Sequence, residues 1–499
     1  MLGIDVSDED DEDTKKIFAK AKVIRSGKDT LYISLETKYN AENLFSEIQM
    51  SWGDDLEDLE SLQLTQQFRC EIDNIFNVIY IDSSIQLENV FKRYARTLFQ
   101  NPKSLEESEK ESLGESIENL NSMISGIKLI DKFQDDLSKE YGHYREEELE
   151  IKIKSEVEMD NIYSKLIPYI SYENGKTYPT AGDVRKKIVE YSILGMESRE
   201  SEKKKVNVFL IEELENHLYR SLQISLSFQL FEDRLFRHMF ITTHSSLIVS
   251  RMDKVTLVKL YNPEKVCGKS VEYIVPKEYK KNKAKLNTEL SEAIFAEKVL
   301  LVEGPSEKIL FERVLGDISP KYECKDRYIL QVDGVAFKTY YEILNKLGIR
   351  CLIKTDNDLK YFEKERKIEF SGINRCAEIA KIGKKNKRTL SLALSKEQFD
   401  NNRKKYQLKY FNEFEKTIVE LKKRGIYLSI IDLENDLYEV ISKTMDQYVK
   451  SAGGRTNPID YLQKAKQNRM VELCERITKA DSKAIFEDDK FLCIKELIQ

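Results

Sequence analysis

Two short apolar runs, each ending in an acidic residue, constrain the fold of this chain more than any other feature. Val299–Val302 leads directly into Glu303, and Leu352–Thr355 leads into Asp356. Runs of this kind are typical of buried strands in a parallel sheet. Between them, Ser306–Leu315 has the pattern of a helix. The sequence therefore predicts an α/β fold, in which the acid at the end of each strand points into the crevice where such sheets bind ligands.

A third carboxylate, Asp358, follows Asp356 after one intervening residue. Three hard oxygen ligands in one crevice suit Mg²⁺ or Mn²⁺ rather than zinc. The alternative is that Glu303, Asp356 and Asp358 are ordinary solvated acids at strand ends, since acidic residues are common on protein surfaces. We interpret the trio as a metal site.

The composition is that of a soluble protein with more than one domain. At about 150 residues per domain, 499 residues predict two or three domains. The hydrophobic residues form no run near the ~18 that a membrane helix needs, and the acidic segment Ser7–Asp13 argues against a signal peptide. Seven scattered cysteines without CxxC spacing predict reduced thiols in a cytoplasmic protein and no zinc site.

The net charge of −6 means that any binding of nucleic acid relies on local basic patches. Three such patches flank the predicted metal site in the sequence: Lys280–Lys285, Lys381–Arg388 and Arg403–Lys405. Solvated surface helices are the ordinary explanation for each patch. Their clustering favours contacts with phosphate groups, which would make binding sensitive to salt.

The chain divides into four parts by its patterns. We predict a strand-rich part at 1–95, a helical insertion at 96–155, alternating helices and strands at 156–288, and a second βα pattern at 289–499. The insertion is expected to form an arm or a dimerisation surface. Glu148–Lys154 alternates strictly between polar and apolar residues, which predicts a half-exposed strand.

The first half carries a pattern that resembles the Walker B segment of ABC-type ATPases. Val206–Ile211 has the pattern of a buried strand, and it ends in Glu212 and Glu213. In such ATPases one acid orients Mg²⁺ and the next polarises the attacking water. Further along, Met239–Thr243 predicts another strand that ends in His244. This histidine either senses a γ-phosphate or is a hydrogen-bonded structural residue.

The phosphate-binding part of an ATP site is incomplete in this sequence. Tyr178–Lys186 resembles a degenerate ABC signature loop at the start of a helix, where backbone N–H groups favour anions. A P-loop requires Gly-x-x-x-x-Gly-Lys-Ser/Thr after a strand, and the nearest segment, Ser26–Thr30, lacks the upstream glycine. We therefore expect an ABC-type ATPase domain without its opening strand, P-loop and helix, which puts ATP binding in doubt.

The order of these motifs resembles the OLD family, in which an ABC-type ATPase is fused to a Toprim nuclease. Within that family the chain resembles the nuclease component of the Gabija anti-phage systems. The resemblance rests on Ala296–Lys308, Ile353–Leu359, Ile431–Leu437 and Tyr461–Lys466, and it extends from about residue 8 to the C-terminus. The chain departs from the family in lacking a P-loop and in having Leu214 where proline often follows the two glutamates.

The resemblance assigns roles to the three acids described first. Glu303 would bind metal or act as a general base toward water. Asp356 and Asp358 would hold Mg²⁺ or Mn²⁺. Two metals about 4 Å apart stabilise both the attacking and the leaving oxygen in phosphodiester hydrolysis.

It also points to residues near the C-terminus. Asp432 follows the apolar run Ile426–Ile431 and would complete a second metal position, with Glu434 as a further ligand. Glu434 and Asp436 otherwise begin a helix. Lys466 would neutralise charge on the scissile phosphate, and its alternative is a surface lysine in a polar helix.

The function implied by the resemblance is a metal-dependent endonuclease that nicks double-stranded DNA in prokaryotic antiviral defence. The implied partners are further copies of the chain, as a dimer or tetramer, and the UvrD-like helicase of the Gabija systems. Nucleotide restrains cleavage in intact members, so this chain would cut without that control or be inactive. Two alternatives stay open: a Toprim strand-transferase of the topoisomerase or primase kind, which the 26 tyrosines allow, and a scaffold without catalysis.

Overall fold

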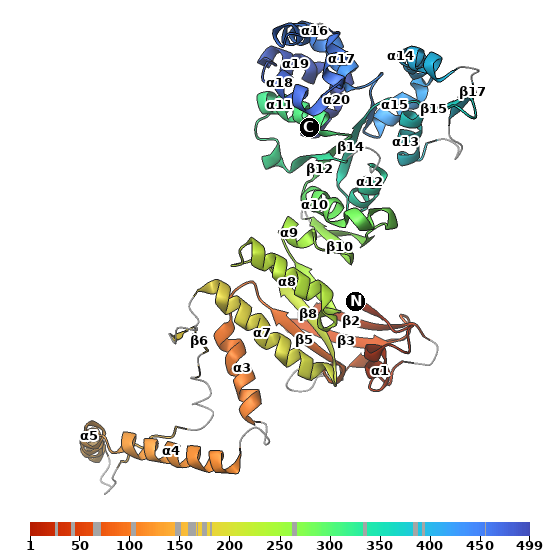
Figure 1. The fold of residues 1–499 in the computed structure, drawn as a ribbon. Coiled ribbons are helices and arrows are strands. Elements are labelled where there is room, and N and C mark those ends of the chain that lie inside the picture. The colour runs from red at the N-terminus through yellow and green to blue at the C-terminus, as the bar shows by residue number, and fades with distance from the viewer. Residues whose placement is uncertain are drawn as a thin grey trace. The chain divides into compact units, whose positions relative to one another are not determined.

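The chain forms two compact units, Met1–His244 and Ser245–Gln499 (Figure 1). The computed structural model describes residues 1–24, 28–40, 45–62, 71–100, 106–144, 151–157, 166, 168–171, 177–179, 182–261, 267–332, 337–382, 388–391, 395–454 and 456–499. Parts of four segments singled out in the sequence lie outside these ranges: Ser26–Gly27, Glu148–Glu150, Thr180–Ala181 and Lys384–Lys387.

The first unit contains an antiparallel sheet in the order β1-β2-β3-β4 and a parallel sheet in the order β5-β8-β9. The antiparallel strands are β1 Leu2–Asp5, β2 Thr30–Asn40, β3 Phe45–Gly53 and β4 Glu60–Leu62. The parallel strands are β5 Phe76–Ile81, β8 Val206–Glu212 and β9 Met239–Thr242, and a hairpin pairs β6 Tyr169–Ser171 with β7 Thr177–Pro179. Trp52 and Phe76 belong to one core that joins the two larger sheets. The strands predicted at Val206–Ile211 and Met239–Thr243 are confirmed.

The helices of the first unit lie before and between the strands of the parallel sheet in the chain. They are α1 Glu12–Phe18, α2 Ile72–Ile75, α3 Leu87–Gln100, α4 Glu107–Ser125, α5 Lys128–Tyr144, α7 Asp183–Glu202 and α8 Arg220–Glu232, with the short 3-10 helix η1 Arg234–Phe236. Helix α7 packs against β8 and α3. Helices α4 and α5 confirm the helical pattern predicted after residue 96.

The strand predicted at Glu148–Lys154 is wrong over its described part. Residues 151–157 alternate in exposure but form no strand. Their backbone amides bind side chains of α4 and α5 instead: Ile153 N donates to Gln134 Oε1 at 2.7 Å, and Val157 N donates to Asn121 Oδ1 at 2.9 Å. An extended segment lying along helices shows the same two-residue period as a strand, so the pattern could not separate them.

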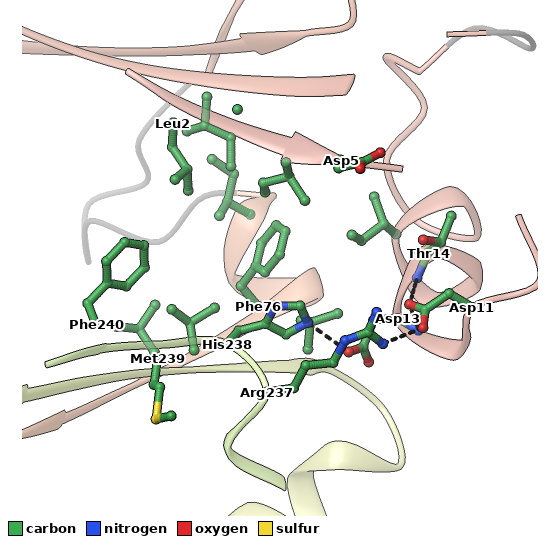
Figure 2. Close-up of a pocket in the computed structure, with 18 of the residues that line it drawn as sticks. Leu2, Asp5, Asp11, Asp13, Thr14, Phe76, Arg237, His238, Met239 and Phe240 are labelled. Carbon is green, nitrogen blue, oxygen red and sulfur yellow. Dashed lines mark hydrogen bonds and ion pairs between the residues drawn. The ribbon is translucent and has the colours of Figure 1, made fainter. Parts of the chain in front are cut away.

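An apolar cavity of about 640 Å³ lies between the two larger sheets of the first unit. Leu2 lines one wall, and the charged residues gather at one end (Figure 2). There Asp11 pairs with Arg237, and Asp13 Oδ2 lies 2.9 Å from His238 Nε2. The bond to His238 holds the pKa of Asp13 well below its usual range. Both aspartates at this end of the cavity therefore have a partner, Arg237 for Asp11 and His238 for Asp13.

The second unit is built on a parallel sheet in the order β13-β12-β14-β18. Its strands are β12 Lys298–Val302, β13 Arg327–Gln331, β14 Arg350–Thr355 and β18 Ile426–Leu428, and each pair is parallel. Every residue of the central strand β12 is buried. Leu301 faces one hydrophobic core and Leu300 faces the other, so both faces of the sheet are covered, as parallel sheets require.

Two groups of helices form these cores. The first group is α10 Lys283–Ile294, α12 Phe337–Lys346, α13 Ser371–Ile379, α14 Lys396–Glu413 and α15 Glu415–Lys423. The second group is α11 Pro305–Ile318, α16 Leu433–Ser451, α17 Pro458–Gln463, α18 Lys466–Cys474, α19 Lys479–Glu487 and α20 Leu492–Ile498. Helix α11 confirms the helix predicted at Ser306–Leu315.

Smaller elements complete the second unit. They are helix α9 Ser246–Val249, the hairpin β10 Lys254–Tyr261 and β11 Cys267–Ile274, the antiparallel sheet β15 Lys360–Phe362, β16 Lys367–Glu369 and β17 Thr389–Ser391, and the 3-10 helices η2 Lys277–Asn282, η3 Glu323–Lys325 and η4 Asp489–Phe491. Val271 and Tyr273 of the hairpin join the core of the first helix group. In the part of the chain that the structure describes, no helix is both long and apolar enough to cross a membrane.

The strand predicted at Ile426–Ile431 is shorter than expected, because β18 ends at Leu428. The amide of Ile430 donates to Asp436 Oδ1 at 3.2 Å rather than to a neighbouring strand. This bond turns the chain toward Asp432, the N-cap of α16.

Candidate active site

The carboxyl ends of three neighbouring strands bring the predicted acids together. Glu303 follows β12, Asp356 follows β14, and Asp432 comes shortly after β18. Thr355 Oγ1 donates to Glu303 Oε2 at 3.0 Å, and Leu433 N donates to Asp356 Oδ1 at 3.1 Å. Asp356 therefore lies between the acid of β12 and the segment that carries Asp432.

The loop that carries Asp356 and Asp358 is fixed on both sides. Gly372 brings the first turn of α13 against it: a Cβ on Gly372 would stand 2.5 Å from Asp356 O and 2.7 Å from Asp358 N. Gly372 N donates to Asp358 O at 3.0 Å. On the other side the buried Asn357 donates through Nδ2 to Ile430 O at 2.9 Å. The backbone contact with Gly372 and the side chain of Asn357 thus fix the loop that carries the two acids.

An arginine that the sequence did not single out lies among these acids. Arg375 Nη2 is 3.2 Å from Glu303 Oε2 and 3.5 Å from Asp358 Oδ2, and it donates to Thr355 Oγ1. Arg403 Nη2 approaches Asp358 Oδ1 from α14 at 3.7 Å. No sequence signal marks Arg375, because it falls in an ordinary amphipathic helix. Only the packing of α13 against the loop brings it to the site.

The remaining predicted residues form a second cluster. Asp432 caps α16 by accepting from Asn435 N at 2.9 Å, and Gln463 Nε2 donates to its Oδ2 at 2.8 Å. Glu434 is 1% exposed, and its Oε1 lies 3.8 Å from Lys466 Nζ. Its other oxygen, Oε2, has no hydrogen-bond partner among the described residues. The structure therefore places Lys466 beside Glu434.

Crowding of carboxylates changes the protonation of this site. Glu307, one helical turn after Glu303, was not predicted; burial and then the charges of Glu303 and Glu434 raise its pKa to about 7. Burial and then Glu307 and Glu303 raise the pKa of Asp356 well above its usual value. Burial lowers the pKa of Lys466, but Glu434 and the other acids raise it by more. The available signal for Glu307 was its place at the third position of a helix that begins at Pro305, where a glutamate can cap the helix start.

The donor set fits a hard divalent cation. All the candidate ligands are carboxylate oxygens, as Mg²⁺ and Mn²⁺ prefer, and the unpaired Oε2 of Glu434 leaves a buried acceptor for a cation. As the side chains are placed, no three Asp, Glu, His or Cys groups in the described ranges are close enough together to hold an ion. Arg375 instead supplies positive charge between Glu303 and Asp358.

The first unit places the predicted nucleotide residues at one edge of its parallel sheet. Glu212 ends β8 and lies opposite Thr242 of β9. Glu213 follows with a φ of 41°, and residues held in such strained backbone are often functional. The amide of His244 donates to Glu215 Oε1 at 2.6 Å, and its side chain is exposed. The acid that contacts His244 is thus Glu215, which the sequence did not single out.

The fold and the carboxylate cluster of the second unit define a Toprim domain. Residues 294–358 match the family described as overcoming lysogenization defect protein-like, TOPRIM domain. The whole chain is 37% identical over 510 aligned residues to the endonuclease GajA of Bacillus cereus strain VD045, which covers 100% of this chain and 87% of that protein. The chain belongs to the GajA endonuclease family.

Two further similarities involve part of the chain. The endonuclease GajA of Bacillus cereus strain HuB5-5 is 22% identical over 316 residues, covering 55% of this chain and 45% of that protein. The C-terminal region of the Burkholderia pseudomallei OLD protein is 16% identical with a TM-score of 0.25, covering 41% of this chain and 100% of that chain. The predicted α/β class, with a Toprim domain in the C-terminal half, is confirmed.

Proposed function

We propose that this chain is a Mg²⁺- or Mn²⁺-dependent DNA endonuclease that nicks double-stranded DNA in anti-phage defence. The observation that carries the proposal is that Glu303, Asp356 and Asp432 each follow one of three adjacent parallel strands, on the same side of the sheet, with Lys466 beside Glu434. Its relatives named GajA are endonucleases, which supports the same reaction class.

In this proposal the acids divide into two sets. Glu303, Asp356 and Asp358 hold one metal ion, and Asp432 and Glu434 hold the second. When bound, the metal ions activate a water molecule and stabilise the charge that develops on the phosphate. Glu303 is placed to accept a proton from that water. The contacts that fix the loop hold Asp356 and Asp358 in place relative to Glu303.

In this proposal, positively charged side chains near the acids contact the phosphate groups of the DNA. Lys466 is partly exposed and lies next to the buried Glu434, so its ammonium group can reach a phosphate while staying close to the acids. Arg403 and Lys404 lie on an exposed stretch of α14, and Arg403 reaches Asp358. Contacts of this kind to the phosphate backbone make binding independent of sequence and sensitive to salt.

The proposal is tested by nicking of supercoiled plasmid with Mg²⁺ or Mn²⁺. We expect Glu303→Gln to lower the rate by ~10²-fold or more, because it removes a metal ligand and proton acceptor without changing the size of the side chain. The exposed Glu312 on α11 provides the matched control, and Glu312→Gln should nick at the wild-type rate. Equal nicking by wild type and Glu303→Gln, or nicking in EDTA, would contradict the proposal.

Family membership is the basis for what we propose about the first unit and about the partners of this chain. We propose that Glu212, Glu213 and His244 are the remainder of an ABC-type ATP site, that the chain assembles into homodimers or tetramers, and that it acts in the cytoplasm with a UvrD-like helicase. The proposal of an ATP site is supported by the pairing of Glu212 with Thr242, which places both at the carboxyl ends of neighbouring strands. Without a P-loop, nucleotide contacts would be few.

A further inference from the structure

The guanidinium of Arg375 lies where a metal ion would have to enter. A single nitrogen, Nη2, is within 3.5 Å of a carboxylate oxygen of Glu303 and of Asp358. Mg²⁺ binds oxygen at about 2.1 Å, so an ion shared by these two carboxylates and the arginine cannot occupy the same space. The side chain is 16% exposed, so the guanidinium is largely enclosed by the protein at this position.

The arginine is held there incompletely. Its Nε is buried without a hydrogen-bond partner among the described residues, and an unsatisfied buried donor carries a cost of about 1–3 kcal/mol. Its guanidinium carbon lies 5.5 Å from the centre of the Phe337 ring, a contact that does not depend on the acids. The guanidinium therefore has one unsatisfied donor beside its ion pairs with Glu303 and Asp358, and its contact with Phe337 does not require those ion pairs.

We propose that Arg375 is a built-in cation that competes with the divalent metal for Glu303 and Asp358. In the metal-free protein its charge offsets the repulsion between these acids, and metal binds only as the guanidinium withdraws. The competition sets how much metal is needed to load the site. This inference rests on the proposed function, because it concerns the same metal ligands.

Mn²⁺ binding provides a direct test that does not depend on cleavage. Free Mn²⁺ is followed by electron paramagnetic resonance as it is titrated into the full-length protein without DNA. We expect Arg375→Met and Arg375→Gln to bind Mn²⁺ about tenfold more tightly, the effect of removing one positive charge about 5 Å from a divalent cation in a solvent-like medium. Arg375→Lys keeps the charge and should keep the wild-type affinity.

Arg403 supplies the matched control, because it touches Asp358 at 3.7 Å but not Glu303. Arg403→Met should change the Mn²⁺ affinity much less than Arg375→Met. Unchanged or weaker binding in Arg375→Met would overturn the inference, and weaker binding would show that the arginine positions Glu303 for the metal. If wild type binds Mn²⁺ and Glu303→Gln does not, the proposed function stands whatever Arg375 does. If no variant binds Mn²⁺, both proposals fail.

Discussion

Glu307 shows how one buried side chain links the chemistry of the site to the stability of the fold. It lies 7% exposed on the first turn of α11, where its carboxylate accepts from Gly304 N at 3.2 Å. Neighbouring acids and burial disfavour its charged form. The site thus holds more negative charge than the fold accommodates without a cation, which is a common property of metal centres.

The raised pKa of Glu307 predicts a pH dependence in EDTA. Because the pKa rises from 4.5 to about 7 on folding, the folded state keeps a proton that the unfolded chain has lost between these values. The free energy of unfolding therefore falls as pH rises from 4.5 to about 7, by on the order of 3 kcal/mol. Glu307→Gln keeps the capping acceptor but removes this dependence.

The measurement is thermal unfolding of wild type and Glu307→Gln from pH 5 to pH 8. The variant should be close to wild type at the acidic end and more stable at the alkaline end. The exposed Glu475 gives the control, since Glu475→Gln should follow the wild-type curve. Parallel curves for wild type and Glu307→Gln would show that Glu307 is ionised in the folded state.

At the level of elements, a buried ion pair ties β14 to α16. Lys354 Nζ lies 2.9 Å from Asp436 Oδ2, and both side chains are 2% exposed. The same lysine donates to Lys490 O at 3.0 Å, and Asp436 also binds the amide of Ile430. The pair therefore fixes the turn that leads from β18 to Asp432. Asp436 has a structural role here, and it lies in the first turn of α16, which was the alternative that the sequence left open for this residue.

Breaking this pair should be more harmful than removing it. Lys354→Met leaves Asp436 buried without its counter-charge, and such a loss costs about 3–5 kcal/mol. The double variant Lys354→Met with Asp436→Leu should recover at least ~1 kcal/mol of that, because no lone charge remains. Urea unfolding of the three proteins measures both quantities. A double variant that is less stable than Lys354→Met would show that the bond to Ile430 matters more than the charge.

The elements also show what could be read from the sequence. The strands before Glu303 and Asp356 were predictable because a buried parallel strand leaves a continuous apolar run, and the acid that ends it is local information. The roles of Arg375 and Gln463 could not be predicted, because these residues reach the acids only through the packing of α13 and α17. For residues 151–157 the sequence pattern led to a wrong prediction. Exposure does alternate with a period of two residues, but the segment lies along helices and not in a sheet.

On the scale of the whole molecule, the two units differ in which of the motifs expected for their sites the sequence contains. The second unit presents all the proposed nuclease residues. In the first unit, the proposed acids Glu212 and Glu213 stand at a sheet edge, but the sequence contains no Gly-x-x-x-x-Gly-Lys-Ser/Thr motif to hold a triphosphate. The activity of the second unit should then be independent of nucleotide.

We expect the rate of plasmid nicking to stay constant as ATP is raised to cellular concentrations at fixed free Mg²⁺. The reason is that the sequence has few of the groups that bind a triphosphate, so nucleotide binding should not alter the proposed nuclease site. Glu213→Gln should likewise leave the rate unchanged. Inhibition by ATP that disappears in Glu213→Gln would show that the first unit still binds nucleotide and communicates with the second.

The contact between Gly372 and the loop of Asp356 and Asp358 has a consequence for how this protein can evolve. Any side chain at 372 would push the start of α13 off that loop, and Arg375 would move with it. The positions of the arginine and of two acids therefore depend on one residue, Gly372, which has no side chain to take part in the chemistry. A single substitution at position 372 would therefore alter the proposed competition between arginine and metal without changing any charged group.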